Sequence, residues 1–118
     1  MKISRIQELL EAKLYCCRDN LEKDVQSVFG CDLMSDALAY VNDQAVLLTG
    51  LVNPQVIRTA VMMDMLCLVF VRSKTPTDEM VKLAEESGLV VMSTEMTMYT
   101  ACGKLYSNGL NRDCKVVR

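Results

Sequence analysis

The sequence contains no histidine and no tryptophan, and aromatic residues make up only 5% of its 118 positions. The absence of histidine removes the commonest general acid–base residue and any Ser–His or Cys–His nucleophile pair. Catalysis by this chain would therefore have to rest on Asp, Glu, Lys, Tyr or Cys. The scarcity of aromatic rings also leaves few platforms on which nucleic-acid bases could stack.

Metal-binding motifs are missing as well, although the chain has six cysteines. No two of them form a C-x-x-C pair, and zinc sites and cubane clusters usually need such close pairs or histidine. We expect no metal site, and we interpret the cysteines as reduced thiols that fill small apolar spaces. The adjacent pair Cys16 and Cys17, together with Cys114, remain candidates for a redox role.

Long basic runs, long apolar runs and nucleotide-binding motifs are also lacking. The formal net charge is −2 and no basic run exceeds two residues, so nucleic-acid binding has no electrostatic footprint. No apolar stretch reaches the roughly 20 residues of a membrane span. Residues 1–13 carry charges throughout, unlike a signal peptide. Neither G-x-x-x-x-G-K-[ST] nor G-x-G-x-x-G occurs. We expect a cytoplasmic protein without a nucleic-acid or membrane partner.

What the sequence does contain is an alternation of apolar, strand-like runs and amphipathic, helix-like segments. Hydrophobic residues are 51% of the chain, enough for the core of one domain. Helices are predicted over 3–14, 32–41, 54–63, 75–87 and 93–105, and strands over 14–17, 25–29, 45–48, 66–71 and 89–92. This order predicts a single three-layer α/β/α domain, residues 1–118, with a mainly parallel sheet of about five strands. Its core should span about 3–110, and 111–118 should fray.

Residues 45–63, AVLLTGLVNPQVIRTAVMM, carry the clearest sign of a binding site. An apolar strand ends at Thr49 and Gly50, Asn53 follows as a helix N-cap, and Pro54 takes the first helical position. A turn of this kind exposes backbone N–H groups and the positive end of the helix dipole, which suits an anion or a polar small molecule. Ligands of parallel sheets bind outside the carboxyl ends of the strands, where this turn should lie.

Two further predicted helix starts, at Asp32 and Thr94, should converge on the same edge of the sheet. The turn that holds Asp32, Ser35 and Asp36 either faces a ligand, with weak Mg²⁺ coordination as one form, or only caps a helix. The expected ligand-binding residues are Asp32, Ser35, Asp36, Thr49, Gly50, Asn53 and Arg58.

Arg58, in the second turn of the helix after Asn53, has two interpretations. It contacts the ligand, or it pairs with a local acid such as Asp36 or Asp64. The N-cap and the proline are explained by helix formation alone, so they support a ligand site only in combination with other residues.

Four segments resemble the DRTGG domain family in their order and spacing. They are DLMSD at 32–36, LLTGL at 47–51, NPQVIRTA at 53–60 and GKLYSNGL at 103–110. The resemblance covers about residues 3–110 and is closest to small stand-alone DRTGG-domain proteins. This chain lacks the literal pentapeptide for which the family is named, and residues 25–31 stand in its place.

The resemblance implies an α/β fold similar to the N-terminal domain of HPr kinase/phosphorylase, without the kinase P-loop. DRTGG domains also occur beside CBS domains and in phosphate acetyltransferases, where they look like regulatory or assembly modules. No activity and no catalytic residue can be carried over from the family, and the cofactor stays unknown.

Three functions follow from these observations. The first is a non-catalytic regulatory, ligand-sensing or assembly module that works as a homo-oligomer, with a dimer favoured. The second is a small enzyme that handles a phosphate or carboxylate substrate with Asp32, Asp36 and Arg58. The third is a thiol-redox or iron–sulfur partner protein based on the adjacent cysteines. The ligand, any protein partner and the oligomer number stay open.

Overall fold

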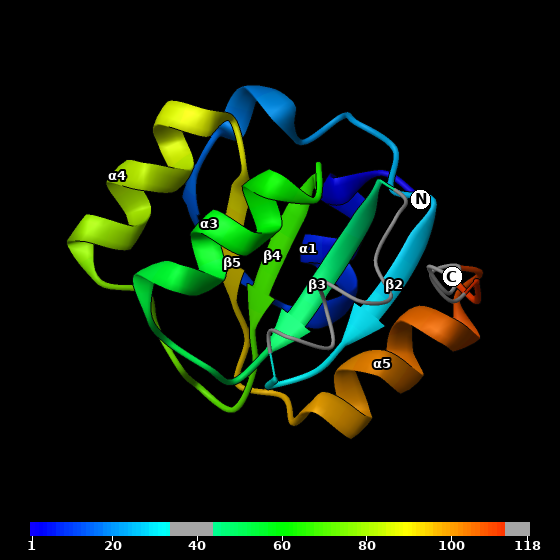
Figure 1. Ribbon diagram of the computed structural model, residues 1–118. Helices are drawn as coiled ribbons and strands as arrows, with labels where there is room; N and C mark the ends of the chain where they lie inside the picture. The colour runs from blue at the N-terminus through cyan, green and yellow to red at the C-terminus, as the bar shows by residue number, and fades with distance from the viewer. Residues whose placement is uncertain (34–43, 113–118) are drawn as a thin grey trace, which may run out of the picture.

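The computed structural model describes residues 1–33 and 44–112, which contain a five-stranded sheet flanked by helices (Figure 1). The helices are α1 (Ile3–Leu10), α3 (Pro54–Met62), α4 (Asp78–Ser87) and α5 (Met98–Ser107), with a short 3-10 helix η1 (Arg18–Asn20). The strands are β1 (Lys13–Cys16), β2 (Ser27–Gly30), β3 (Ala45–Thr49), β4 (Cys67–Phe70) and β5 (Val90–Ser93). All but the first two residues of the helix predicted over 32–41, and the segment 113–118, lie outside the described residues.

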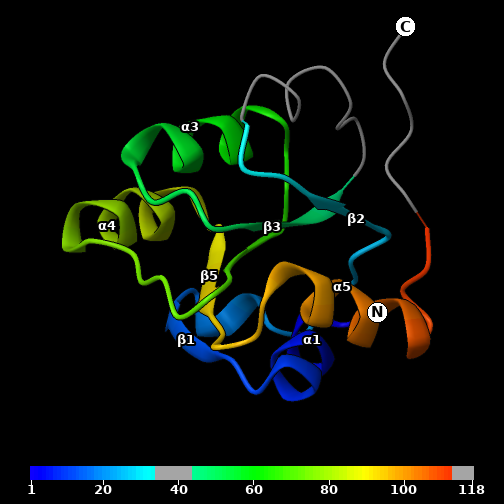
Figure 2. The same ribbon diagram turned by 90° about the horizontal axis from the view of Figure 1, so that it is seen from below.

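The strands are ordered β1-β5-β4-β3-β2, and all neighbours pair in parallel except β1, which is antiparallel to β5. Figure 2 shows α3 and α4 on one side of this sheet and α1 and α5 on the other. The prediction of a three-layer α/β/α fold with a mainly parallel sheet of about five strands is therefore confirmed. The parallel strands bring their carboxyl ends to one edge of the molecule.

Alternate side chains of the central strands enter two separate cores. In β3, Ala45 and Leu47 pack with residues of α3 and α4, whereas Val46 and Leu48 pack with residues of α1 and α5. All five residues of β3 are buried. A strand covered on both faces needs an apolar residue at nearly every position, which explains the continuous apolar runs in the sequence.

The boundaries of two helices differ most from the sequence prediction. The first helix ends at Leu10 instead of residue 14, because Glu11 turns left-handed at φ 50° and donates its N–H to the carbonyls of Gln7 and Glu8. The last helix starts at Met98, capped by Thr97 and not by Thr94. The hydroxyl of Thr94 instead donates to the carbonyl of Leu10 at 2.7 Å. Polar residues clustered before a helix do not reveal which of them is the cap.

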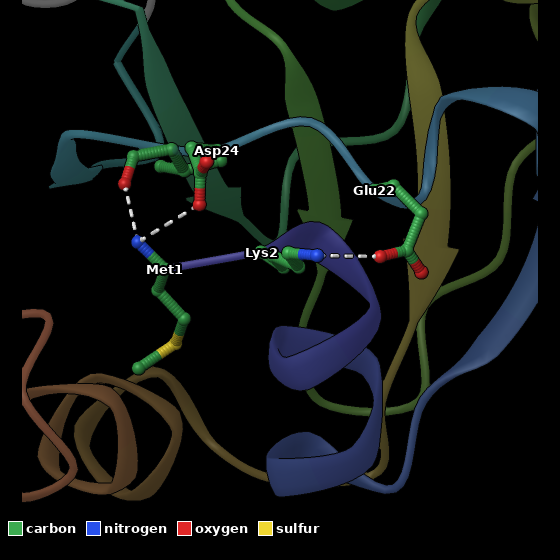
Figure 3. Close-up of polar contacts among 5 residues, drawn as sticks. Met1, Lys2, Glu22 and Asp24 are labelled. Atoms are coloured by element: carbon green, nitrogen blue, oxygen red, sulfur yellow. Dashed lines mark hydrogen bonds and ion pairs between the residues drawn. The ribbon is translucent and has the colours of Figure 1, made fainter.

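The start of α1 is attached to the segment between η1 and β2 (Figure 3). The Met1 ammonium donates to the carbonyl of Val25 at 2.9 Å and lies 3.9 Å from the Asp24 carboxylate. Lys2 Nζ donates to Glu22 at 2.9 Å, and this hydrogen bond raises the pKa of the lysine. These contacts hold the amino end of α1 while its apolar side packs into the core.

The two edge strands of the sheet are β1 and β2, and residues at the end of the described chain lie against β2. The Val28 N–H donates to the carbonyl of Arg112 at 3.1 Å, and Leu110 is buried in the same core as α1 and α5.

In the part of the chain that the structure describes, no helix is long and apolar enough to cross a membrane.

The left-handed backbone at Glu11 gives a testable stability prediction. Replacing Glu11 by glycine should raise the free energy of unfolding by about 1 kcal/mol, because glycine adopts positive φ without the Cβ clash. Glu8→Gly, in the body of the same helix, should lower it by about 1 kcal/mol. Urea unfolding of the two variants checks both signs. A loss of stability in the Glu11 variant would contradict the assigned helix end.

Candidate functional site

The carboxylate of Asp32 lies at the carboxyl edge of the sheet and joins the ends of three strands. Its Oδ1 accepts hydrogen bonds from the Gly50 N–H at 2.7 Å and from the Thr49 hydroxyl at 3.2 Å. Its Oδ2 lies 3.5 Å from Nη2 of Arg72. Asp32 follows β2, Thr49 ends β3, and Arg72 follows β4. One carboxylate thus receives a backbone donor, a hydroxyl and a guanidinium.

Gly50 is required for this arrangement because the Arg72 guanidinium lies directly over it. A Cβ atom at position 50 would overlap the guanidinium, whereas the backbone of Gly50 has no positive φ that would demand glycine. The side chains of Asp32 and Arg72 are 49% and 48% exposed. An ion pair this open to water contributes at most about 1 kcal/mol, so solution anions can compete for the arginine.

The turn after β3 is stabilised by its own side chains. The buried Thr49 hydroxyl also accepts the Leu51 N–H at 3.1 Å. Asn53 caps α3 by accepting the Val56 N–H at 3.2 Å, and Pro54 occupies the first turn, as predicted. Because the cap uses one N–H and proline supplies none, the amino end of α3 retains little capacity for an anion. The donor suited to an anion at this turn is the Gly50 N–H, and Asp32 already occupies it.

The structure brings three of the predicted ligand-binding residues together: Asp32, Thr49 and Gly50. Asn53 lies nearby as a helix cap. Arg58 is exposed on α3 and forms no ion pair with Asp64 or any other acid in the described ranges 1–33 and 44–112. Ser35 and Asp36 lie outside those ranges.

Arg72 is the site residue that the sequence reasoning missed. It lies two residues after the buried strand β4, which pairs with β3 over its whole length, and the intervening Val71 is also buried. A cation placed immediately after a buried parallel strand lies at the carboxyl edge by construction, so the rule that points to Gly50 also points to Arg72. Arg72 and Ser73 both have left-handed backbones, with φ values of 58° and 60°.

The adjacent cysteines lie on another part of the molecule, beside α4. The Cys16 thiol is buried and donates to the carbonyl of Leu89 at 3.3 Å. Burial, followed by the neighbouring Cys17, raises the pKa of Cys16 to about 12, and burial also raises the pKa of Cys17. Reactive redox cysteines have lowered pKa values, so this environment favours a structural role for the pair. In the described part of the chain, no three His, Cys, Asp or Glu side chains are grouped to hold a metal ion.

Comparisons with known proteins agree with this fold. The family model described as "DRTGG domain" matches residues 5–107, which confirms the resemblance drawn from the sequence. No curated protein matches the chain. A solved structure with a similar fold contains the CBS and DRTGG domains of the regulatory region of Clostridium perfringens pyrophosphatase, complexed with the activator diadenosine tetraphosphate.

That structure superimposes with a TM-score of 0.72 at 15% sequence identity, and the match covers 88% of this chain. It covers only 45% of the pyrophosphatase chain. At this identity the similarity establishes the fold.

Because a Cβ atom at position 50 would overlap the Arg72 guanidinium, we expect Gly50→Ala to break the ion pair between Asp32 and Arg72. In a double-mutant cycle, Asp32→Ala and Arg72→Ala should show a coupling free energy of about 0.2–1 kcal/mol. The same cycle in a Gly50→Ala background should show none, because the added Cβ displaces the guanidinium. Gly103→Ala is the matched control, since a Cβ at this helical glycine meets nothing within 4 Å. Coupling that survives Gly50→Ala would contradict the geometry.

The raised pKa of Cys16 predicts a loss of stability at alkaline pH. The folded state keeps the thiol neutral up to about pH 12, whereas the unfolded chain ionises near the ordinary value of 9.0. The free energy of unfolding therefore keeps its full value below pH 9 and falls as the pH rises toward 12, by roughly 1–2 kcal/mol at pH 10.5. Urea unfolding at several pH values should show a shallower decline for Cys16→Ala. The control Val91→Ala, a truncation at the paired position of β5, should keep the wild-type slope.

Proposed function

The chain belongs to the DRTGG domain family, and on that premise we propose that it is a non-catalytic regulatory module that senses a small anionic ligand. The ligand would bind at the carboxyl edge of the sheet, at the turn that begins at Thr49 and Gly50. A regulatory role is supported by the pyrophosphatase with the similar fold, whose regulatory region contains a DRTGG domain. It is also supported by the lack of histidine.

The observation that carries the proposal is the carboxylate of Asp32 bound to Gly50 and Arg72. A backbone N–H at 2.7 Å and a guanidinium at 3.5 Å are the donors that hold carboxylates and phosphates in many binding sites. In this protein, the chain's own carboxylate acts as the anion. A ligand of the same chemistry could replace it at little cost, because Asp32 and Arg72 are both half exposed.

Replacement of Asp32 would turn ligand binding into a structural signal. Asp32 holds the chain after β2 to the ends of β3 and β4, together with the Cys31 N–H, which donates to the carbonyl of Leu48 at 3.0 Å. A ligand that takes over Gly50 and Arg72 would release that contact. The affinity of the ligand is then lowered by the free energy needed to displace Asp32. The charge of the Asp32 carboxylate therefore sets the ligand concentration at which the contact is released.

The same proposal includes self-association and a cytoplasmic location. Tyr99 and Tyr106, seven residues apart on α5, are 89% and 67% exposed, and Met62 at the end of α3 is 67% exposed. Large apolar side chains in such positions favour contact with a second copy, with a dimer as the simplest closed assembly. The buried cysteines Cys16 and Cys67 are free thiols, as expected in a reducing compartment.

Substitutions at Arg72 and Arg58 distinguish a ligand at the carboxyl edge of the sheet from a ligand on α3. In an NMR titration of the labelled protein with inorganic phosphate, the Gly50 amide resonance should shift and saturate. Arg72→Ala should weaken phosphate binding about tenfold, which corresponds to about 1.4 kcal/mol. Asp32→Asn should strengthen binding by up to about tenfold, because the competing charge is removed. Arg58→Ala is the matched control and should bind phosphate like the wild type.

Two outcomes would contradict the proposal. If phosphate leaves the Gly50 amide unchanged in both the wild type and Asp32→Asn, the edge of the sheet does not bind anions. If Arg58→Ala weakens binding and Arg72→Ala does not, the ligand lies on α3 and the Asp32 contact is only structural. Thermal unfolding of each variant, without phosphate, confirms that it is folded.

A further inference from the structure

The chain changes faces of the sheet between the carboxyl ends of β4 and β5. After β4 it continues into α4, which packs with Phe70 and Leu68 on one face. After β5 it continues into α5, which packs with Met92 and Val90 on the opposite face. Figure 2 shows the two connections leaving the sheet in opposite directions. Open α/β sheets bind ligands at such a point, because the diverging loops leave a crevice between them.

A pocket of about 760 Å³ lies at this point. Its walls come from the loop after β4, the loop after β5, and the turn between α1 and β1. The antiparallel pairing of β1 with β5 explains the third wall, since Lys13 at the start of β1 lies opposite Ser93 at the end of β5. The volume is within the range of small-molecule sites.

Hydrogen bonds between the three wall segments preform the pocket. The left-handed residues Arg72 and Ser73 donate their N–H groups to the carbonyls of Met96 and Thr94, at 2.8 and 3.0 Å. The Ser93 hydroxyl donates to the carbonyl of Lys74 at 2.6 Å, and the Thr94 hydroxyl joins the third segment at Leu10. Two consecutive non-glycine residues at positive φ cost about 1–2 kcal/mol each, and such strain is concentrated at binding sites.

The polar side chains that line the pocket divide into those with a partner and those without one. Ser93 and Thr94 are engaged in the bonds that hold the walls. Within residues 1–33 and 44–112, the carboxylates of Glu11 and Glu95 form no hydrogen bond or ion pair. The Lys13 ammonium lies 5.1 Å from the centre of the Tyr15 ring and has no acidic partner among these residues.

We propose that this pocket binds a small zwitterion of amino-acid size. Its ammonium would meet the carboxylates of Glu11 and Glu95, and its carboxylate would meet Lys13. The Tyr15 ring would cover its carbon skeleton, with Leu10 and Met96 as the other apolar lining residues. Two acidic groups against one base make the pocket net negative, so a free anion is disfavoured here and preferred at Arg72. The two sites therefore select different ligands.

The site can be tested by NMR on the whole labelled chain, with each of the twenty standard L-amino acids as probes. At least one should shift the amide resonances of Lys13, Ser73 and Glu95 in a saturable manner. Putrescine and inorganic phosphate, which lack one of the two charges, should bind at least tenfold more weakly, as measured at Lys13 and Glu95, because phosphate at the neighbouring Arg72 would also shift Ser73. If none of the amino acids shifts these resonances, the proposed site is wrong. If putrescine binds more tightly than every amino acid, the assignment of a zwitterion is wrong.

Charge-removing variants then test the assigned contacts. Glu95→Gln and Lys13→Met should each lower the affinity for the amino acid about tenfold, because each removes the charge that pairs with one end of the zwitterion. Glu86→Gln and Lys82→Met, exposed on α4, are the matched controls and should bind within twofold of the wild type. Unchanged affinity in both pocket variants overturns the proposal. Asp32→Asn should leave this affinity unchanged, so failure of the phosphate site and failure of this one are distinguishable.

Discussion

Burial of the central strands on both faces is the constraint on which the rest of this molecule depends. Because β3 and β4 pack into one core with α3 and α4 and into a second core with α1 and α5, both faces of these two strands are closed to a ligand. Polar chemistry is confined to the two ends of the strands. The parallel direction of β2 to β5 then gathers Asp32, Thr49 and Arg72 at one of these ends.

At this edge, neighbouring loops create two environments of different charge. Arg72 extends over Gly50 toward the Asp32 carboxylate, whereas the next residue, Ser73, lines the pocket with the free carboxylates of Glu11 and Glu95. The backbone of Arg72 and Ser73 is fixed by bonds to the loop after β5. Arg72 and Ser73 therefore form a short, strained segment at which the two environments meet.

The layers and strands could be predicted from the sequence because buried parallel strands leave unbroken apolar runs such as LCLVFV at 66–71. The Asn53 cap could also be predicted, because a cap depends on neighbours along the chain. The position of Arg72 at the carboxyl edge could have been predicted, since it follows a buried apolar run, but its pairing with Asp32 could not. An arginine forty residues away gives no local signal, and Arg58 is closer along the chain. Thr94 was mistaken for a cap because its hydroxyl bonds to Leu10 in another element.

The carbonyl of Arg112 bonded to Val28 has a consequence for how copies of this protein can meet. An uncovered edge strand invites another chain to add a strand, which leads to open-ended association. At β2, the Val28 donor is already used by the chain's own later residues. A second copy could extend the sheet there only by first displacing that segment. The β2 edge is thereby disfavoured as a place where a second copy could pair, whereas the exposed side of α5 offers a surface at which a contact could close on itself.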